Sequence, residues 1–557
     1  MSSDSGSDFE GFNQQDVDDA QANVLSDVNE SDIEVSEIDS ESDSDQSGAS
    51  DHNSDDGEGA DIDWSANTHD VVLNPFQQRT GPNHGLPPEA NELDYFFCFW
   101  GDDWFDMIAQ ETNRYAEQRI RASGRADPLW VPTTRNEMRA YFAINIMMGI
   151  KQLPRIWCYW STNPALNCAW VSSVMPQTRF LKLSQYLHLR DNTGMPQHGE
   201  ENFDRLYKLR PILDELPGRF RDVYRPRCEL SVDEGMIGFK GRLSFRQYIP
   251  AKPTKWGIKV WQLCESQSAY CLNFEVYTGR VAGVLAPHGL GHRVVMNMMH
   301  PYLNRNHHVY FDRFFTSTQL MEDLEEAGTY ACATVMLNRR GLPNEARRLK
   351  LRRRGETFFR QKENEVLTVW KDKRQVSVLS TNSNATVQER ARKPDAVLNY
   401  NAHMGGVDKA DQLRSYYKVG RVSKKWWRYI MWYLFDISIV NAWILFQSSP
   451  HEPQMRRGYD QLQFRLNLAE HLRAGFTSRK FRKGRRSRDV LGEAFDQENI
   501  NGHKLVPVEN KRRKAVCRQC SRENRKTPKG YQVETSVKCS VCDVALCRVG
   551  CFLEYHG

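Results

Sequence analysis

The spacing of apolar residues changes near Cys228, and this change divides the chain into two kinds of structure. From residue 91 to about 224, apolar residues recur every three or four positions, which is the spacing of amphipathic helices. From 229 to 337 the pattern predicts strands in short runs such as ELSVDE, GIKVWQLCE, AYCLNFEVYTG, HHVYFDRF and YACATVML. Three strands, a helix, a strand, a helix and a strand predict a mixed α/β sheet.

The length of 557 residues is too great for one hydrophobic core, so we expect several domains. An acidic stretch at the start is too poor in aliphatic residues to fold by itself. Shifts in composition and periodicity predict eight segments: an acidic disordered tail (1–85), a helical domain (86–225), the first part of the sheet-based core (226–337), a basic β-rich insertion (338–395), the second part of the core (396–418), a second helical region (419–477), a basic linker (478–514) and a cysteine-rich domain (515–557).

The formal net charge of +4 hides a strong asymmetry. Residues 1–63 carry 21 Asp and Glu and no Lys or Arg, which leaves 75 basic against 50 acidic residues in the rest. A basic body of this kind predicts a polyanionic partner, and nucleic acid is the first candidate. The acidic tail either keeps the chain soluble or competes with DNA for the same surface.

One apolar stretch, residues 426–446 (WWRYIMWYLFDISIVNAWILF), is long enough to span a membrane. It contains Arg428, Asp436 and Asn441, so a buried helix of a soluble protein is the better interpretation. The N-terminus is acidic and polar, unlike a signal peptide. We therefore expect no membrane partner. We also expect no small-molecule substrate, because nucleic acid is the predicted partner.

Four aspartates stand where a sheet and a helix can aim them at one point. Asp233 and Asp312 each end a predicted strand, and Asp408 and Asp411 share a helical face because they are three residues apart. This is an RNase H-like arrangement, in which carboxylates hold two Mg²⁺ ions that cut and rejoin phosphodiester bonds. The alternative is that each Asp is an ordinary helix cap or turn residue.

The composition after Asp233 favours the metal-site interpretation. Residues 235–264 contain no acidic residue, and a basic hairpin beside carboxylates would neutralise the phosphates that flank a scissile bond. In the insertion, Trp370 either stacks on an unpaired base or packs in a small β core, and the core interpretation is favoured. The predicted DNA contacts are Lys240, Arg242, Arg246, Lys252, Lys255, Lys259 and Trp370.

Six of the 13 cysteines fall in the last 41 residues at spacings typical of zinc sites. Two zinc ions need eight ligands, and we expect His556 as the seventh and His503 as the eighth. Closed thiolate sites indicate structural zinc in a RING- or PHD-like brace, and protein binding is one interpretation of its role. The six cysteines are Cys517, Cys520, Cys539, Cys542, Cys547 and Cys551.

The chain resembles the piggyBac-type transposases over most of its length from about residue 95. The resemblance rests on many motifs in order: ETNRY (111–115), NIMMGIKQLP (145–154), YWS (159–161), TRFLKLSQYLHLRDN (178–192), VDEGMIGFKGR, YIPAKPTKWGIKVW, FDRFFTS, YNAHMGGVDKADQ and LCRVGCFLEYH.

This resemblance implies that the first helical domain serves dimerisation and DNA binding, and that the helices after Asp411, with Trp426 and Trp427, rejoin it. It also implies a catalytic triad of Asp233, Asp312 and Asp408, supported by Asp411, with two Mg²⁺ ions. In the family, water nicks the transposon end, the freed 3′-hydroxyl forms a hairpin, and the end is joined at TTAA. A homodimer acting on double-stranded transposon ends is therefore expected. The resemblance also implies DNA-end recognition as the other interpretation of the zinc module.

Two rival functions remain open at this level. The first is a host-adopted descendant that binds DNA and no longer cuts it. The second is a chromatin or ubiquitin-ligase module built on the zinc brace. Residues 511–514 (KRRK) are interpreted either as a nuclear localisation signal or as a DNA contact, and both interpretations predict a nuclear protein.

Overall fold

The computed structural model describes residues 64–197, 199–200, 202–250, 252, 254–279, 287–420, 422–450, 458–478, 502–508, 515–527, 530–547 and 550–556. The chain divides into two compact units, Met1–Arg479 and Lys480–Gly557. The predicted tail over residues 1–63, most of the predicted basic linker and the KRRK motif lie outside the described residues.

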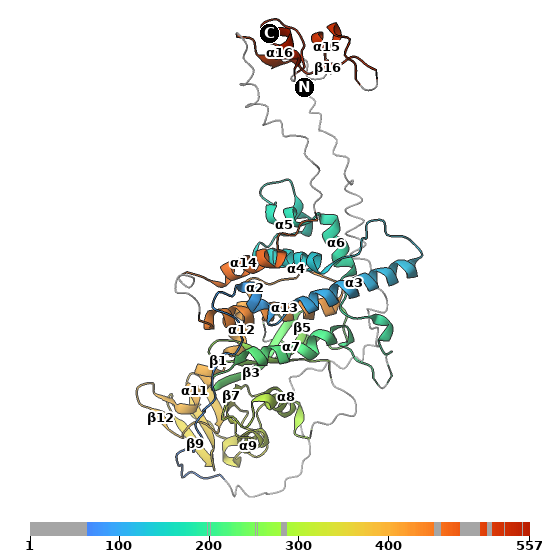
Figure 1. Cartoon of the computed structure of the whole chain (residues 1–557). Coiled ribbons are helices and arrows are strands. Elements are labelled where there is room, and N and C mark those ends of the chain that lie inside the picture. Colours follow the sequence, from blue (N-terminus) through green and yellow to red (C-terminus); the bar gives the residue numbers. More distant parts are fainter. Residues whose placement is uncertain are drawn as a thin grey trace, which may run out of the picture. The chain divides into compact units, whose positions relative to one another are not determined.

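The part of the larger unit before residue 224 is helical, as its apolar spacing predicts (Figure 1). Polar caps set several boundaries: Asn91 Oδ1 accepts a hydrogen bond from Leu93 N, and Thr134 Oγ1 accepts one from Glu137 N. Gly124 ends the longest of these helices in the left-handed conformation. The helices are α2 (Glu92–Phe97), α3 (Asp102–Ser123), α4 (Arg135–Ile150), α5 (Ala169–Val174), α6 (Gln177–Tyr186) and α7 (Arg210–Val223), with short 3-10 turns η2 (Ile156–Trp160), η3 (Asn192–Gly194) and η4 (Tyr207–Leu209).

Two helices that follow the sheet in sequence return to this helical part (Figure 1). α13 (Trp426–Ser448) packs on α2, and α14 (Gln461–Arg473) packs on α2 and α4. Aromatic rings make much of this contact: the ring of Phe435 lies edge-on to those of Trp100 and Phe96, with centroids 5.0 and 5.4 Å apart. One core is therefore built from segments far apart in the sequence.

Among the described helices, only α13 is long and apolar enough to cross a membrane by length and composition. In the structure it is a core helix, and its polar residues have partners within the protein. Asp436 Oδ1 lies 3.2 Å from Arg465 Nη1 on α14, and Asn441 exchanges two hydrogen bonds with the backbone of Cys271, at 2.9 and 2.8 Å. Arg428 donates to backbone carbonyls. These pairings let charged and amide groups sit in an apolar helix.

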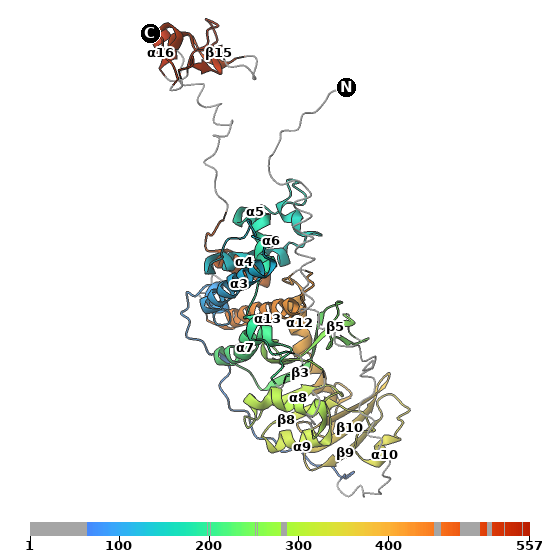
Figure 2. The same cartoon turned by 90° about the vertical axis from the view of Figure 1, so that its right-hand side faces the viewer.

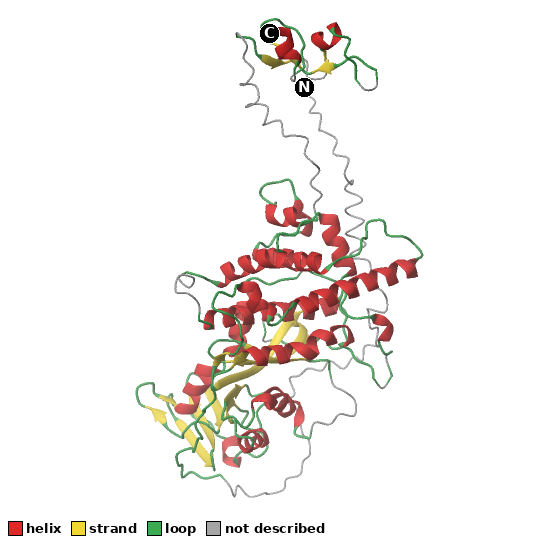
Figure 3. Ribbon diagram, in the orientation of Figure 1, coloured by secondary structure: helices red, strands yellow, loops and turns green. Residues whose placement is uncertain are grey.

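The rest of the larger unit is built on a mixed nine-stranded sheet (Figure 3), which confirms the predicted α/β class. β3, β7 and β8 are parallel to one another, with crossovers through α8 (Gly289–Met299), η5 (His300–Tyr302) and α9 (Thr318–Glu326), and the other pairs are antiparallel. The strand order is β4 (Gln247–Tyr248), β5 (Trp256–Glu265), β3 (Glu229–Gly238), β7 (His308–Phe311), β8 (Tyr330–Thr334), β11 (Gln375–Ser380), β10 (Glu365–Lys371) and β9 (Thr357–Lys362), with β6 (Cys271–Val276) also paired to β5.

The basic insertion continues this sheet rather than forming a separate body. Strand β11 pairs with β8, with Ser380 opposite Cys332, so the three insertion strands cover what would be an exposed edge of the core sheet. The chain then enters the helices that carry the later aspartates. The remaining elements here are α10 (Asn344–Arg347), β12 (Val387–Gln388), β13 (Lys393–Pro394), α11 (Asp395–His403) and α12 (Gly406–Ser415).

The structure differs from the prediction over residues 64–85, which we call the strap. The sequence places them in the acidic tail, but they contact the sheet and the helices. Trp64 Nε1 donates to Gly341 O at 2.8 Å, and Asn74 N donates to the Tyr330 hydroxyl at 2.7 Å. The acidic run ends at residue 63, and aromatic residues that can pack against the protein follow it. The average composition of residues 1–85 does not reveal this change. The strap ends in β1 (Gly81–Pro82), which pairs with β2 (Tyr224–Arg225).

The smaller unit is a compact module around a few apolar side chains, including Leu505, Val537, Leu546 and Phe552. Strand β14 pairs with β17, so the module begins before the predicted boundary at residue 515. The pairing brings the segment that carries His503 into the fold. The elements are β14 (Leu505–Pro507), β15 (Ala515–Val516), α15 (Arg518–Arg522), β16 (Glu534–Thr535), β17 (Val537–Cys539) and α16 (Cys551–His556).

The buried Asp436–Arg465 pair gives a stability prediction. Both side chains are at most 1% exposed, so Arg465→Met leaves an uncompensated buried carboxylate and lowers the free energy of unfolding by about 3–5 kcal/mol. In the double variant with Asp436→Asn, the amide oxygen still accepts from Val419 N and most of the loss is recovered. Urea unfolding followed by tryptophan fluorescence measures both; equal losses in the single and double variants would contradict the expectation.

Candidate active site and zinc-binding groups

The register of two parallel strands brings the first two aspartates together. Val232 on β3 lies opposite Phe311 on β7, and the next residues along these strands are Asp233 and Asp312. Asp312 follows the last residue of β7, where its carboxylate accepts a hydrogen bond from Phe314 N at 2.9 Å. The two side chains therefore stand side by side where the parallel strands separate.

Helix α12 brings the other two aspartates over β3 because it approaches the strand closely. A Cβ atom at Gly406 would lie 2.3 Å from Ser231 Oγ, so only glycine fits at this contact. At the other end, Asp411 Oδ2 lies 3.4 Å from the position of a Cβ atom at Gly235. Asp408 and Asp411, one turn apart on α12, are thereby held against the strand that carries Asp233.

Neighbouring side chains fix the orientation of Asp411. Its Oδ1 accepts hydrogen bonds from Arg414 Nε at 3.3 Å and from the Tyr433 hydroxyl at 3.4 Å. The Arg414 guanidinium also lies over the Tyr433 ring, 4.4 Å from its centroid. Since Tyr433 belongs to α13, the core helix directly supports a carboxylate of the site.

Burial controls the charge of the carboxylates. It raises the pKa of Asp233 to about 7, and the nearby charge of Glu234 adds to this effect. Burial also raises the pKa values of Glu234 and Asp312. A bound divalent cation would oppose these shifts, because positive charge favours the ionised carboxylates. The cluster is therefore one that a cation stabilises.

The ammonium group of Lys252 lies among these carboxylates. Its Nζ is 4.0 Å from Asp233 Oδ2 and 3.6 Å from Glu234 Oε1, and it donates to Glu234 O at 3.1 Å. Burial lowers the pKa of Lys252, but the charges of Asp233, Glu234, Asp408 and Asp411 outweigh burial and raise it overall. Asp233 and Glu234 therefore pair with Lys252, and the α12 aspartates lie near enough for their charges to act on it.

The aspartate donor set suits a hard cation such as Mg²⁺, which prefers carboxylate oxygens. The four side chains are spread around Lys252 rather than closed on one point. In the part of the chain that the structure describes, only two Cys and His groups bring three or more possible ligand atoms within 4.8 Å of one another. The carboxylates therefore lie farther apart than the ligand atoms of the Cys and His groups in the smaller unit.

The predicted DNA contacts after Asp233 fall into different environments. Lys240, Arg242 and Lys255 are exposed, and Arg246 is half-buried with its guanidinium 4.4 Å from the centroid of the Trp256 ring. This group forms a basic surface on the segment that leads to Lys252.

Two of the predicted DNA contacts are buried instead. Lys259 is 5% exposed, with its Nζ 5.2 Å from the centroid of the Phe314 ring, so it does not lie at the surface. Trp370 is 6% exposed in an apolar cluster with residues such as Tyr310 and Val378. Neither side chain is placed to contact DNA, and for Trp370 the structure matches the favoured core interpretation.

Sequence reasoning missed three residues of the site. Glu234 directly follows Asp233, and strand alternation places successive side chains on opposite faces, so nothing local marks it as a partner of Lys252. Arg414 and Tyr433 reach Asp411 only after α12 and α13 have packed. For Arg414, the three-residue spacing from Asp411 on one helix was a usable signal.

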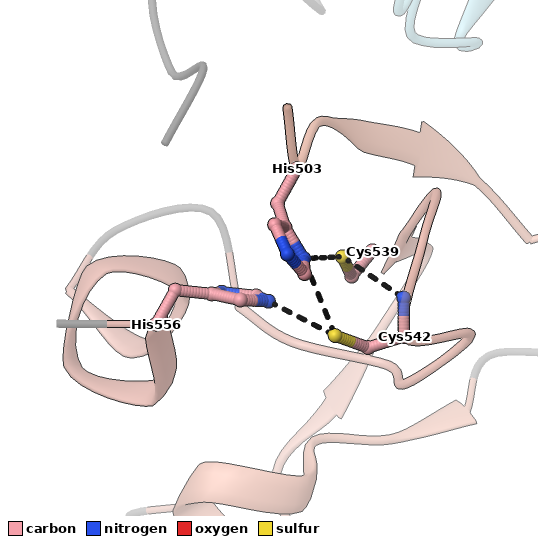
Figure 4. Close-up of side chains that lie close together, drawn as sticks. All are labelled: His503, Cys539, Cys542 and His556. Atoms are coloured by element: carbon pink, nitrogen blue, oxygen red, sulfur yellow. Dashed lines mark hydrogen bonds between the residues drawn. The ribbon is translucent and has the colours of Figure 1, made fainter. Parts of the chain in front are cut away.

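In the smaller unit, four predicted zinc ligands converge from separate segments (Figure 4). His503 Nδ1 lies 3.4 Å from Cys539 Sγ and 3.3 Å from Cys542 Sγ, and Cys542 Sγ lies 3.4 Å from His556 Nε2. Atoms that share a tetrahedral zinc ion at about 2.0–2.3 Å stand about 3.3–3.8 Å apart, so these separations fit one ion.

The other four cysteines form a second group with the same character. Cys520 Sγ lies 3.8 Å from Cys547 Sγ and 3.4 Å from Cys551 Sγ, and Cys517 completes the set. The two groups interleave along the chain, because residues 517 and 520 fall between residues 503 and 539 of the first group. This is the crossed arrangement that the spacing predicts, with His503 and His556 both included.

Comparison with known families supports this division of the chain. A family model described as Transposase IS4 matches residues 91–443, and a model described as a DDE_Tnp_1-like zinc finger matches residues 498–557. The first covers the helical part and the sheet with all four aspartates, and its chemistry implies a divalent metal. The second covers both Cys and His groups and implies zinc.

Several proteins are similar to this chain over most of its length. The human PiggyBac transposable element-derived protein 3 is 26% identical over 516 residues, which cover 87% of this chain and 80% of the relative. The human PiggyBac transposable element-derived protein 2 is 27% identical over 456 residues, which cover 77% and 72%.

A solved structure shares the fold. It is a piggyBac transposase synaptic complex with hairpin DNA, which is 24% identical and matches 85% of this chain and 98% of that chain with a TM-score of 0.67. The transposase model alone spans more than half of the sequence, and its match includes the residues that form the carboxylate site. The chain therefore belongs to the piggyBac-type transposase family, with a DDE-type domain followed by a zinc finger.

Proposed function

We propose that this protein is a cut-and-paste DNA transposase that uses two Mg²⁺ ions at its aspartates. The observation that carries the proposal is the placement of Asp233 and Asp312 at neighbouring positions of two parallel strands, with helix α12 holding Asp411 over the strand that carries Asp233. An open site of carboxylates suits a pair of ions that leave positions free for the attacking and leaving oxygens.

In the proposed mechanism, Asp233, Asp312 and Asp408 would hold the ions and Asp411 would support these three carboxylates. The ions, when bound, would activate the attacking hydroxyl and stabilise the leaving oxygen. Arg414 and Tyr433 keep Asp411 in position through its Oδ1. Four basic residues would contact backbone phosphates near the site: the exposed Lys240, Arg242 and Lys255 and the half-buried Arg246. They lie near the site because Lys252, on the same segment, reaches the carboxylates.

The order of DNA steps follows from the family to which the chain belongs. We propose that water nicks the transposon end, that the freed 3′-hydroxyl forms a hairpin on the opposite strand, and that the end is joined at TTAA by a homodimer in the nucleus. The solved relative is a synaptic complex with hairpin DNA, which supports the hairpin step. The zinc module is proposed to hold two ions and to serve DNA-end recognition.

A second candidate is a host-adopted protein that binds DNA without cutting it. It is favoured by the relatives above, which are named as proteins derived from transposable elements. The two candidates share the fold and differ only in whether the carboxylate site still works.

Cleavage of DNA by the aspartate variant separates these candidates. Asp312→Asn removes a metal-holding charge worth several kcal/mol in the transition state, so strand cleavage with Mg²⁺ falls by about 10³-fold or more while duplex binding is kept. The substrates are duplexes taken from the DNA on either side of the gene, each placed next to a TTAA sequence. Asp214→Asn, an exposed aspartate on α7, serves as the control and cleaves like the parent protein.

Two results would count against the proposal. A parent protein that binds these duplexes and does not cut them supports the host-adopted candidate. An Asp312→Asn variant that cuts at the parent rate places the chemistry elsewhere.

Zinc content tests the assignment of the two Cys and His groups. We expect two zinc ions per chain by elemental analysis of the purified protein, because each group offers four ligands at tetrahedral spacing. Cys520→Ser and Cys542→Ser each lower the content by at least one ion. Cys98→Ser, at a half-buried cysteine of the helical part, leaves the content unchanged. Fewer than two ions in the parent protein would refute the pairing of eight ligands.

A further inference from the structure

The insertion carries a dense positive surface that the active site does not use. Leu351 N donates to Gln375 Oε1 at 3.1 Å and Gly355 N donates to Lys371 O at 2.8 Å. The segment before β9 therefore lies along the β10–β11 turn, next to the end of the sheet that β9, β10 and α10 occupy in Figure 2. Exposed side chains from both segments form what we call the basic patch: Arg347, Arg348, Lys350, Arg352, Arg353, Arg354, Lys373 and Arg374.

Most of these charges have no carboxylate partner within the described residues. The salt bridge from Arg354 to Asp372, at 2.8 Å, is the only one that the patch makes there. Lys350, Arg352, Arg353 and Arg354 line an open hollow of about 670 Å³ together with Glu356. A concave surface lined by charges of one sign concentrates an oppositely charged ligand.

Glu356 supplies one negative charge against the four positive charges that line this hollow. Its Oε2 is engaged by the backbone, because it accepts hydrogen bonds from Arg352 N at 2.7 Å and from Arg353 N at 3.0 Å. The basic patch therefore has an excess of positive charge, which suits an acidic ligand from outside the described residues.

The strap attaches the acidic N-terminal segment beside this patch. Ser65 pairs with Gln361 on β9, and Trp64 Nε1 donates to Gly341 O. Gln361 is four residues from Thr357 on the same strand, which is about 13 Å. Glu356 directly precedes Thr357. The acidic segment therefore joins the strap, at Trp64, about one strand length from the hollow.

The composition of that chain complements the patch. Residues 1–63 contain 21 Asp and Glu and no Lys or Arg. Six of these lie in residues 51–63, a stretch that spans up to about 45 Å when extended and so reaches the hollow easily. Attachment at the strap gives the segment an effective concentration on the order of mM at the patch.

We infer that residues 51–63 bind the basic patch of the same chain and compete there with the phosphates of DNA. The docking itself rests on charge and attachment, whereas the competition rests on the proposed DNA-binding function. The tail then acts as an intramolecular competitor that DNA must displace from the basic patch. Its binding to the patch weakens as the salt concentration rises.

Carbodiimide cross-linking of the full-length protein tests the docking without DNA or catalysis. The reagent joins carboxylates to lysines, and the patch offers Lys350 and Lys373. We expect peptides that link residues 51–63 to these lysines, in a monomer-sized band, and their loss at 1 M salt. The paired substitutions Arg352→Gln and Arg353→Gln reduce the Lys373 links by about tenfold or more.

Lys240 and Lys255 provide matched controls, because they are exposed lysines of the other basic surface. Links from the tail to these lysines alone would overturn the assigned surface. Links to no lysine, or links that persist at 1 M salt, would overturn the docking.

Duplex binding tests the competition. A variant that begins at residue 64 binds duplex DNA on the order of tenfold more tightly at 0.1 M salt, because the tethered competitor is gone. In the Arg352→Gln, Arg353→Gln background the same deletion has little effect. An equal gain in both backgrounds would show that the tail acts elsewhere and would overturn the competition, whatever the cleavage assay reports.

Discussion

The site depends on how closely α12 approaches β3. Gly406 meets Ser231, and Asp411 stands over Gly235, at distances that leave no room for a Cβ atom at Gly406. The parallel register of β3 and β7 supplies Asp233 and Asp312 on one plane, but without this helix contact the site would have only half of its carboxylates. The stability of the helix–strand packing is therefore the condition for any chemistry at this place.

That packing is in turn held by the core helix α13. Tyr433 reaches from α13 to Asp411, and one turn away Asp436 pairs with Arg465 in the interior of the helical part. The same helix thus carries a buried ion pair that ties it to α14 and a hydroxyl that positions a carboxylate. A helix that resembles a membrane span in composition is here the link between the helical part and the sheet.

Local pattern predicted much of this structure. Alternation located the strands β3, β5, β6, β7 and β8, and cysteine spacing with two histidines located both zinc groups, because these signals act over short stretches of chain. The four aspartates were also found from their contexts. Contacts between segments that are distant in the sequence could not be predicted. Glu234 lies beside Lys252, and Tyr433 lies beside Asp411, only after the chain has folded. Burial could not be predicted either: the sequence suggests that Lys259 is a surface cation, but it is buried with its Nζ against the ring of Phe314.

The central proposal is that Asp233, Asp312, Asp408 and Asp411 together bind divalent metal in the space around Lys252. Iron-directed cleavage of the polypeptide tests it most directly, because Fe²⁺ bound in place of Mg²⁺ reduces added hydrogen peroxide to hydroxyl radicals that cut nearby backbone, and added ascorbate regenerates the Fe²⁺. The account predicts cuts clustered at residues 233, 312 and 408–411, suppressed by excess Mg²⁺ and absent from a variant that lacks these carboxylates. Cuts confined to other regions, or a pattern that Mg²⁺ does not suppress, would contradict it.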